Sequence, residues 1–238
     1  MKKRCVLDKI SVEINYIRHG EALLIDKNLQ TKDYFAQDIY DNLALTDKGR
    51  QQAKDVAKGL STRIKQDEII ILISSPIKRA QQTAEIIKRE FRKYSIVIKE
   101  ESIIDFLRSA EGLDRVKSEY SSLSGNELFD KWISSGFPLS VTYLETYLSV
   151  TNRYKRFLSF IDELRVKYHT FKKLRVIAVA HAELPDYIMV KYFNNYGLKN
   201  CEILNIDIDS SDNALLSITG SGDVEIEVKE TLKNLLII

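Results

Sequence analysis

Two histidines and two arginines in the sequence have side chains suited to phosphoryl transfer. Arg18 and His19 end one apolar run, Arg79 follows a second run by about one helical turn, and His181 ends a third. Two guanidinium groups can hold a phosphoryl group by forked hydrogen bonds. A neutral imidazole can attack phosphorus, and a second, protonated imidazole can stabilise charge on the phosphoryl oxygens. If these four side chains meet in space, they form a phosphate site with its own nucleophile.

The elements that must position these residues are strands and helices in alternation. Alternation of this kind predicts an α/β fold, a three-layer α/β/α sandwich with a mostly parallel sheet. In such sheets ligands bind outside the carboxyl ends of the strands, where the four residues fall. Residues 202–228 alternate apolar and polar side chains, which indicates two or three antiparallel edge strands. The strand-like runs cover residues 12–17, 69–73 and 174–180, and helical patterns cover residues 47–66, 76–94 and 141–168, with another helix beginning near Pro185.

Local signals mark the ends and buried faces of these helices. Thr46 is a suitable N-cap for the first helix, and Ser75 for the second, with Pro76 as its first residue. The apolar stripe of the long third helix includes Leu144 and Leu148, which we expect to be buried.

Composition indicates a soluble globular protein whose balanced charge does not favour binding to nucleic acid or to an anionic membrane. The 238 residues carry 36 basic and 34 acidic side chains, a net charge of +2, and no apolar segment long enough for a signal peptide or membrane span. We expect one catalytic domain over residues 1–238, located in the cytoplasm, with no nucleic acid or membrane as partner and with 106–142 as a lid insertion. The apolar tail from Leu235 to Ile238 can pack on the core or form a subunit contact, so a homodimer is possible.

Four segments in order resemble the histidine phosphatase superfamily, in its phosphoglycerate mutase-like branch. The segment around Arg18-His19-Gly20 is similar to its Arg-His-Gly signature, and residues 45–53, 74–84 and 179–181 resemble its later motifs. The resemblance implies that His19 accepts the phosphoryl group, that Arg18, Arg79 and His181 bind phosphate, and that no cofactor is needed.

A leaving alkoxide needs a proton, so a carboxylic acid should stand beside the pocket. The family branch that the chain resembles places this acid after the third strand, and Asp105 is the residue that best fits its pattern. Glu101 and Glu111 lie close by in the sequence and are rival candidates. Glu183 is another, because it follows His181 by two residues, near the place where the family's other branch has an aspartate.

The chain departs from the family pattern at three places. Ile25 stands where an asparagine often contacts phosphate, and Asn28 can substitute only if the loop is rearranged. Ala182, Glu183 and Leu184 replace glycines that commonly follow the second histidine. The paired arginines by which mutases hold a substrate carboxylate are missing, since residues 113–142 offer a single arginine, Arg115, with the lysines Lys117 and Lys131.

We therefore expect a metal-independent phosphatase that hydrolyses phosphate monoesters through a phosphohistidine on His19. A mutase-type phosphotransferase and a non-catalytic module that binds a phosphorylated ligand are the alternatives. A metal site on His19 and His181 is least favoured, because the sequence has three histidines without ligand spacing. The third, His169, is expected on the surface, while Glu21, Gln82 and Thr83 are expected to brace the site.

Overall fold

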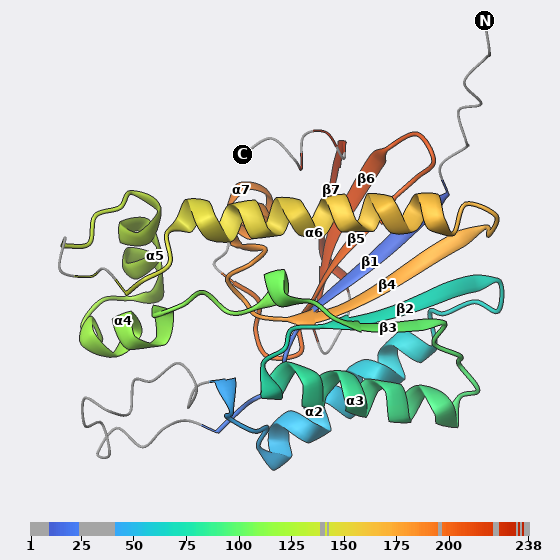
Figure 1. Cartoon of the computed structure of the whole chain (residues 1–238), viewed down its shortest axis with the longest axis horizontal. Coiled ribbons are helices and arrows are strands. Elements are labelled where there is room, and N and C mark those ends of the chain that lie inside the picture. The colour runs from blue at the N-terminus through green and yellow to red at the C-terminus, as the bar shows by residue number, and fades with distance from the viewer. Residues whose placement is uncertain are drawn as a thin grey trace, which may run out of the picture.

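The computed structural model describes residues 10–23, 41–138, 141, 143–194, 197–220, 224–231, 233 and 235. Within them the strands β1 to β7 form a sheet in the order β3-β2-β4-β1-β5-β6-β7 (Figure 1). The first four strands in this order run parallel, and β5, β6 and β7 continue the sheet antiparallel. This confirms the predicted α/β class, with one difference, because β5 pairs inside the sheet with β1. The strands are β1 Ser11–Arg18, β2 Glu68–Ser74, β3 Glu100–Ile103, β4 Lys173–Ala180, β5 Ile203–Ile208, β6 Asn213–Thr219 and β7 Val224–Thr231.

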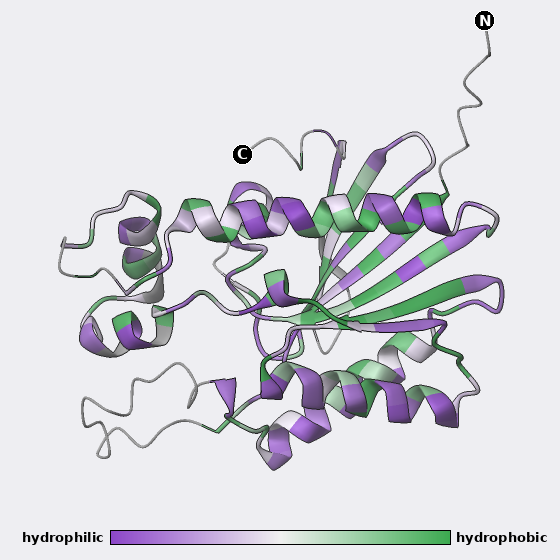
Figure 2. Cartoon of the chain, in the orientation of Figure 1, coloured by the Kyte–Doolittle hydropathy of each residue, from purple (hydrophilic) through white to green (hydrophobic). Residues whose placement is uncertain are grey.

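The helices form two layers that cover opposite faces of the sheet. On one face α6 (Tyr147–Lys167) and α7 (Asp186–Phe193) pack on strand residues such as Ile14 and Val176. On the other face α2 (Asp47–Ser61) and α3 (Lys78–Lys93) pack on residues such as Ile17. Figure 2 shows hydrophobic residues concentrated in the strands and hydrophilic residues along the helices. None of the helices in the described residues is both long and apolar enough to cross a membrane.

The pairing of β1 with β4 sets the position of the two histidines. Arg18 is opposite Ala180 in the parallel register, so the next residues, His19 and His181, leave the sheet at the same level. The backbone amide of His19 donates to the Ala180 carbonyl at 3.0 Å, which continues the ladder beyond the strand. The neighbouring strand β2 ends at Ser74, so all three strand ends meet at one edge.

Residues 105–138 lie beyond the carboxyl ends of the strands. They form the 3₁₀ turn η3 (Asp105–Leu107) and the short helices α4 (Leu113–Glu119) and α5 (Gly125–Ile133). Figure 1 shows α4 and α5 past the end toward which the parallel strands converge. The lid insertion that we expected over residues 106–142 covers most of this segment, and we call residues 105–138 the insertion.

Several details of the predicted helices are wrong. Ser75 does not cap α3, whose N-cap is Ile77 and has no side-chain cap bond. The third helix begins at Tyr147, well after the predicted start, and Leu148 is 66% exposed because it lies at the first turn of α6, away from the sheet. Thr46 does cap α2, since its hydroxyl accepts a hydrogen bond from the Gly49 amide at 3.0 Å. Leu235 is buried within the chain's own core.

A buried arginine binds two glutamates at the opposite end of the sheet from the histidines. Arg175 of β4 donates to Glu68 at 2.6 Å and contacts Glu13 of β1. It also donates to the Asn15 side chain at 3.0 Å. The pKa of Glu13 is lowered, because the charges of Arg175 and Lys173 outweigh the effect of burial. Three adjacent strands are therefore joined by ion pairs centred on a buried guanidinium.

We expect Arg175→Met to lower the free energy of unfolding by about 3–5 kcal/mol, because it leaves the buried Glu68 carboxylate without the cation that it binds and leaves Glu13 with Lys173 alone. Chemical denaturation at neutral pH measures this. The matched control is Lys172→Met, which removes the exposed lysine next to Asp67 and should change the free energy by less than about 1 kcal/mol. Equal losses in the two variants would contradict the prediction.

Candidate active site

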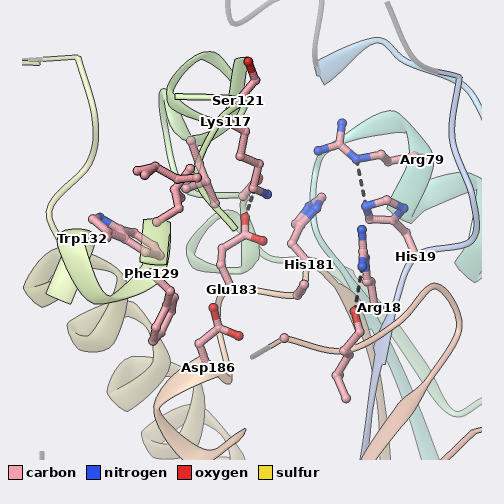
Figure 3. A pocket seen from close by; sticks show the side chains of 17 residues that line it. Arg18, His19, Arg79, Lys117, Ser121, Phe129, Trp132, His181, Glu183 and Asp186 are labelled. Atoms are coloured by element: carbon pink, nitrogen blue, oxygen red, sulfur yellow. Dashed lines mark hydrogen bonds between the residues drawn. The ribbon is translucent and has the colours of Figure 1, made fainter. Parts of the chain in front are cut away.

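The structure brings together four of the residues singled out from the sequence. The rings of His19 and His181 lie edge to face with centroids 5.1 Å apart. The Arg79 side chain reaches from the first turn of α3 and donates from Nε to His19 Nε2 at 3.0 Å. Arg18 lies on the same side, and its Nη1 donates to the Leu198 carbonyl at 2.7 Å (Figure 3). Side chains from β1, α3 and β4 thus surround one space.

The hydrogen bonds of His19 determine which ring nitrogen carries the proton. Its Nδ1 lies 2.7 Å from the Gly20 carbonyl, which can only accept, so Nδ1 is the protonated nitrogen. Nε2 therefore carries the lone pair, consistent with the hydrogen bond that it receives from Arg79. Burial, then the positive charge of Arg79, lowers the pKa of His19 to about 3. The ring is therefore neutral at ordinary pH, with its lone pair on Nε2.

The second imidazole is fully buried beside the first. Its Nε2 shares a hydrogen bond with the Ser75 hydroxyl at 3.0 Å, and that hydroxyl also accepts from the Ile77 amide. Burial lowers the pKa of His181 well below its ordinary value, with further contributions from His19 and the arginines. His181 Nδ1 is buried and has no hydrogen-bond partner among the described residues. A polar atom is thus left for a ligand.

The loop that follows His19 is held against α3 by short-range contacts. The Gly20 amide donates to the Thr83 hydroxyl at 3.1 Å, and this hydroxyl donates to the Arg79 carbonyl at 2.8 Å. A Cβ on Gly20 would collide with the Gly49 carbonyl, so a glycine is required there. Thr83 therefore braces the nucleophile loop, as the sequence suggested.

Two other predicted bracing residues connect the same loop to its neighbours. Glu21 accepts hydrogen bonds from the Thr46 hydroxyl at 3.0 Å and from Lys48 at 2.7 Å. The Gln82 side chain accepts from the Leu45 amide at 2.8 Å. Ile25 and Asn28, the positions of the first departure from the family pattern, lie outside the described residues.

The four residues line one end of a cavity of about 540 Å³. Its opposite wall comes from the insertion, where Phe129 and Trp132 face the histidines across the cavity (Figure 3). The remaining lining residues come from the insertion, from the segment between β4 and the start of α7, and from the loop between α7 and β5. These are Ser109, Leu113, Lys117, Ser121, Leu123, Leu128, Ala182, Glu183, Asp186, Gly197 and Leu198.

Of the four carboxylates that the sequence offered as the acid, the cavity contains Glu183. The structure does not bring Asp105 to it, because the Asp105 side chain is 84% exposed and pairs with Arg108 at 2.7 Å. Glu101 is also exposed and pairs with Lys88 at 2.7 Å. Glu111 is exposed and does not line the cavity. Asp105 thus fits the sequence pattern of the family's acid, but its side chain is exposed to solvent and does not line the cavity.

Glu183 is buried and held by the insertion. One carboxylate oxygen accepts from the Ala110 amide at 2.8 Å and from the Ser109 hydroxyl. Burial pushes the pKa of Glu183 upward, but the charge of Lys117 and these hydrogen bonds outweigh it, and the pKa is lowered. The lowered pKa favours the ionised form of Glu183.

Asp186 is a cavity carboxyl that sequence reasoning missed. It is the first residue of α7, and burial, followed by the charge of Glu183, raises its pKa well above the ordinary value. The pKa values of the two carboxyls are thus shifted in opposite directions, although they lie a few residues apart in the chain. The available signal was its position at the start of the helix that follows His181, where a helix terminus faces the ligand edge of the sheet.

Glu145, two residues before α6, and Arg153 of α6 hold the insertion through several hydrogen bonds. Arg153 binds both of its oxygens, at 2.9 and 2.6 Å, and the Glu111 amide donates to one of them at 3.3 Å. Trp132 donates from its indole nitrogen to the Glu145 carbonyl at 2.8 Å. Arg153 also donates to the Arg108 carbonyl at 2.6 Å. The wall that carries Trp132 is therefore tied to a long helix.

The other basic residues of the insertion do not line the cavity. Arg115 pairs with Glu119 at 2.8 Å and stacks over the ring of Tyr143, and Lys131 lies outside the lining. His169 is exposed, as expected. Among the described residues no group of three or more His, Cys, Asp or Glu side chains is placed to hold a metal ion.

The lowered pKa of His19 predicts a pH dependence of stability. Between about pH 6.5 and about pH 3 the unfolded chain binds a proton at His19 that the folded chain does not. The free energy of unfolding should therefore fall as pH drops through this window, by up to about 1.4 kcal/mol per pH unit from this group. Urea unfolding at pH 7, 6 and 5 should show a shallower fall in His19→Asn than in the wild type. An identical fall of the free energy of unfolding with pH in the two proteins would contradict the lowered pKa of His19.

Solved structures with this fold include several enzymes that act on phosphate esters. A phosphoglycerate mutase from Bacillus anthracis superposes with a TM-score of 0.60 at 18% identity, over 96% of this chain and 97% of that one. A putative alpha-ribazole-5'-P phosphatase from Escherichia coli gives a TM-score of 0.58 at 17% identity, over 92% and 99%. A mycobacterial glucosyl-3-phosphoglycerate phosphatase gives 0.55 at 16% identity, over 84% and 94%. These likenesses show the fold.

No curated protein matches the sequence. Residues 14–222, in contrast, match the sequence model of the histidine phosphatase superfamily (branch 1). The match includes every one of the four clustered residues and supports an activity of phosphatase or mutase type. The chain belongs to the histidine phosphatase superfamily.

Proposed function

We propose that the protein is a phosphatase that hydrolyses phosphate monoesters through a phosphohistidine on His19. The observation that carries the proposal is the His19 ring, whose unprotonated Nε2 lies in hydrogen-bond contact with the Arg79 guanidinium at the end of a cavity. A buried cationic group beside a neutral nucleophile favours an anion whose central atom can be attacked.

In the first step Arg79 and Arg18 bind the oxygens of the phosphoryl group, and Arg79 releases His19 Nε2 to do so. The lone pair on Nε2 forms a bond to phosphorus while the bond between phosphorus and the ester oxygen breaks. The bond from Nδ1 to the Gly20 carbonyl holds the ring in orientation and stabilises the positive charge that the ring gains. His181 donates from Nδ1 to a phosphoryl oxygen, since the charge of a bound phosphate raises the pKa of a nearby imidazole.

The ester oxygen leaves with a proton from Glu183. The negative charge of a bound phosphate raises the pKa of a neighbouring carboxyl, so substrate binding favours the protonated form that the empty cavity disfavours. In the second step a water attacks phosphorus, Glu183 takes its proton, and the bond between phosphorus and nitrogen breaks. Phosphate and neutral His19 are regenerated. Glu183 regains from the water the proton that it gave to the leaving group, so the cycle is balanced.

We expect His19→Ala to reduce hydrolysis of p-nitrophenyl phosphate by about 10³-fold or more, because the nucleophile is removed. The matched control is His169→Ala, at an exposed histidine, which should keep full activity. Brief reaction of the wild type with labelled substrate should leave an acid-labile, base-stable phosphoryl group that His19→Ala lacks. EDTA should leave the rate unchanged, and loss of activity on chelation would contradict a metal-independent reaction.

The same preparation separates the alternatives. Exchange of label between 2- and 3-phosphoglycerate through phosphorylated His19 would indicate a mutase-type phosphotransferase. Tight phosphate binding with no label on His19 and no turnover of any ester would indicate a binding module. Either result would overturn the proposed phosphatase.

Glu183→Gln and Asp105→Asn test the assignment of the acid. We expect Glu183→Gln to lower kcat for an alkyl phosphate by about 10²–10⁴-fold, because the poor leaving group depends on the proton. The loss for p-nitrophenyl phosphate should be much smaller, since its leaving group needs no proton. Asp105→Asn should change neither rate by more than about twofold, given the exposure of that side chain. A large loss of kcat for the alkyl phosphate in Asp105→Asn, with little loss in Glu183→Gln, would identify Asp105 as the acid instead.

A further inference from the structure

The cavity has two chemically different ends. The phosphate end is lined by the arginines and histidines, and the far end is lined by apolar side chains of the insertion (Figure 3). Leucines and two aromatic rings from three segments make up this far wall, which we call the apolar wall. Its members are Leu113, Leu123, Leu128, Phe129 and Trp132.

The rings of the apolar wall are fixed in place. Phe129 and Trp132 pack edge to face with centroids 5.9 Å apart, and both also contact the ring of Tyr147. The Trp132 indole nitrogen is bound to the Glu145 carbonyl, so the ring has no polar atom left for a ligand. A wall of this kind favours an apolar, ring-sized group over a small hydrated one.

Charged and polar groups lie between the two ends. Lys117 and Glu183 both line the cavity, and the positive charge of Lys117 lowers the pKa of Glu183. Asp186 is a buried carboxyl whose pKa is raised well above its ordinary value by burial and by the charge of Glu183, and its Oδ1 is buried without a hydrogen-bond partner among the described residues. Figure 3 places both carboxyls between the histidines and the aromatic rings. A leaving group therefore meets a carboxyl oxygen that has no hydrogen-bond partner among the described residues, together with opposite charges on Lys117 and Glu183.

A carboxylate on the leaving group has no guanidinium to bind there. The lining of the far end contains no arginine in the described residues, and Arg115 is occupied by Glu119 and Tyr143. Glu183 would lie close to a substrate carboxylate, and repulsion between like charges is large where water is excluded.

We propose that the far end of the cavity selects phosphate esters of neutral alcohols with an apolar, ring-sized body, and rejects esters that carry a carboxylate. Asp186 hydrogen-bonds a polar atom of the alcohol, and the apolar wall packs on its ring. This inference rests on the proposed phosphatase activity and adds its substrate class.

Two pairs of substrates test the inference with the wild-type protein. In each pair the scissile phosphate is on a primary alcohol, so differences report binding of the remainder. We expect kcat/KM for 2-phenylethyl phosphate to exceed that for ethyl phosphate by about tenfold or more, because the wall buries the ring. We expect glycerol 3-phosphate to exceed 3-phosphoglycerate by about tenfold or more, because the carboxylate is repelled.

Failure of the inference differs from failure of the phosphatase proposal. Equal or better hydrolysis of 3-phosphoglycerate, or no gain from the phenyl ring, would overturn the substrate class while His19 still turned over. An absence of hydrolysis and of labelling at His19 with all four esters would overturn the phosphatase itself.

A matched pair of variants tests the missing guanidinium. Ser121 is exposed and lines the cavity, whereas its neighbour Ser122 is exposed and does not. Ser121→Arg should raise kcat/KM for 3-phosphoglycerate relative to glycerol 3-phosphate by about tenfold, by supplying a partner for the carboxylate. Ser122→Arg should leave the ratio unchanged. An unchanged ratio in Ser121→Arg, or an equal rise in both variants, would contradict selection by local charge.

Discussion

The parallel pairing of β1 with β4 is the constraint on which the site depends. It fixes two histidines at one level of the sheet, although 162 positions separate them in the sequence. The pairing of β2 with β4 then brings Ser75 to His181, and α3 carries Arg79 back over His19. Since each side chain leaves a buried strand or the first turn of a helix, its direction follows from hydrogen bonding of the backbone, and little rearrangement is needed to bind an anion.

Burial gives the phosphate end an unusual balance of charge. Two arginines remain cationic there, while both imidazoles are kept neutral by burial and by those same arginines. In the proposed reaction the neutral imidazole attacks phosphorus, and the neighbouring guanidinium binds the anion. Glu183 adds a carboxylate whose pKa is lowered, and the negative charge of a bound phosphate would raise that pKa.

Strands, layer order and the four clustered residues could be predicted, because buried strands are visible as apolar runs and the family motifs lie at their ends. Side-chain direction could not. Asp105 and Glu183 both follow strands, and only the fold shows that the first faces water while the second is enclosed by Ser109 and Ala110. Leu148 fits a helical stripe that extends past the sheet it would pack on. Asp186 becomes notable through burial, which no local pattern reveals.

The attachment of the insertion to Glu145 has a consequence for how the cavity admits its ligand. The Glu111 amide, the Trp132 indole nitrogen and the Arg153 guanidinium all donate hydrogen bonds to Glu145, and Arg153 also donates to the Arg108 carbonyl. If the insertion moved as a hinged flap, several of these hydrogen bonds would have to break together. The insertion is therefore held in a fixed position over the cavity. Under the proposed function, selectivity then follows from the shape already present. Ser121 is an exposed lining residue, so its replacement changes the inner surface of the cavity without removing a core side chain.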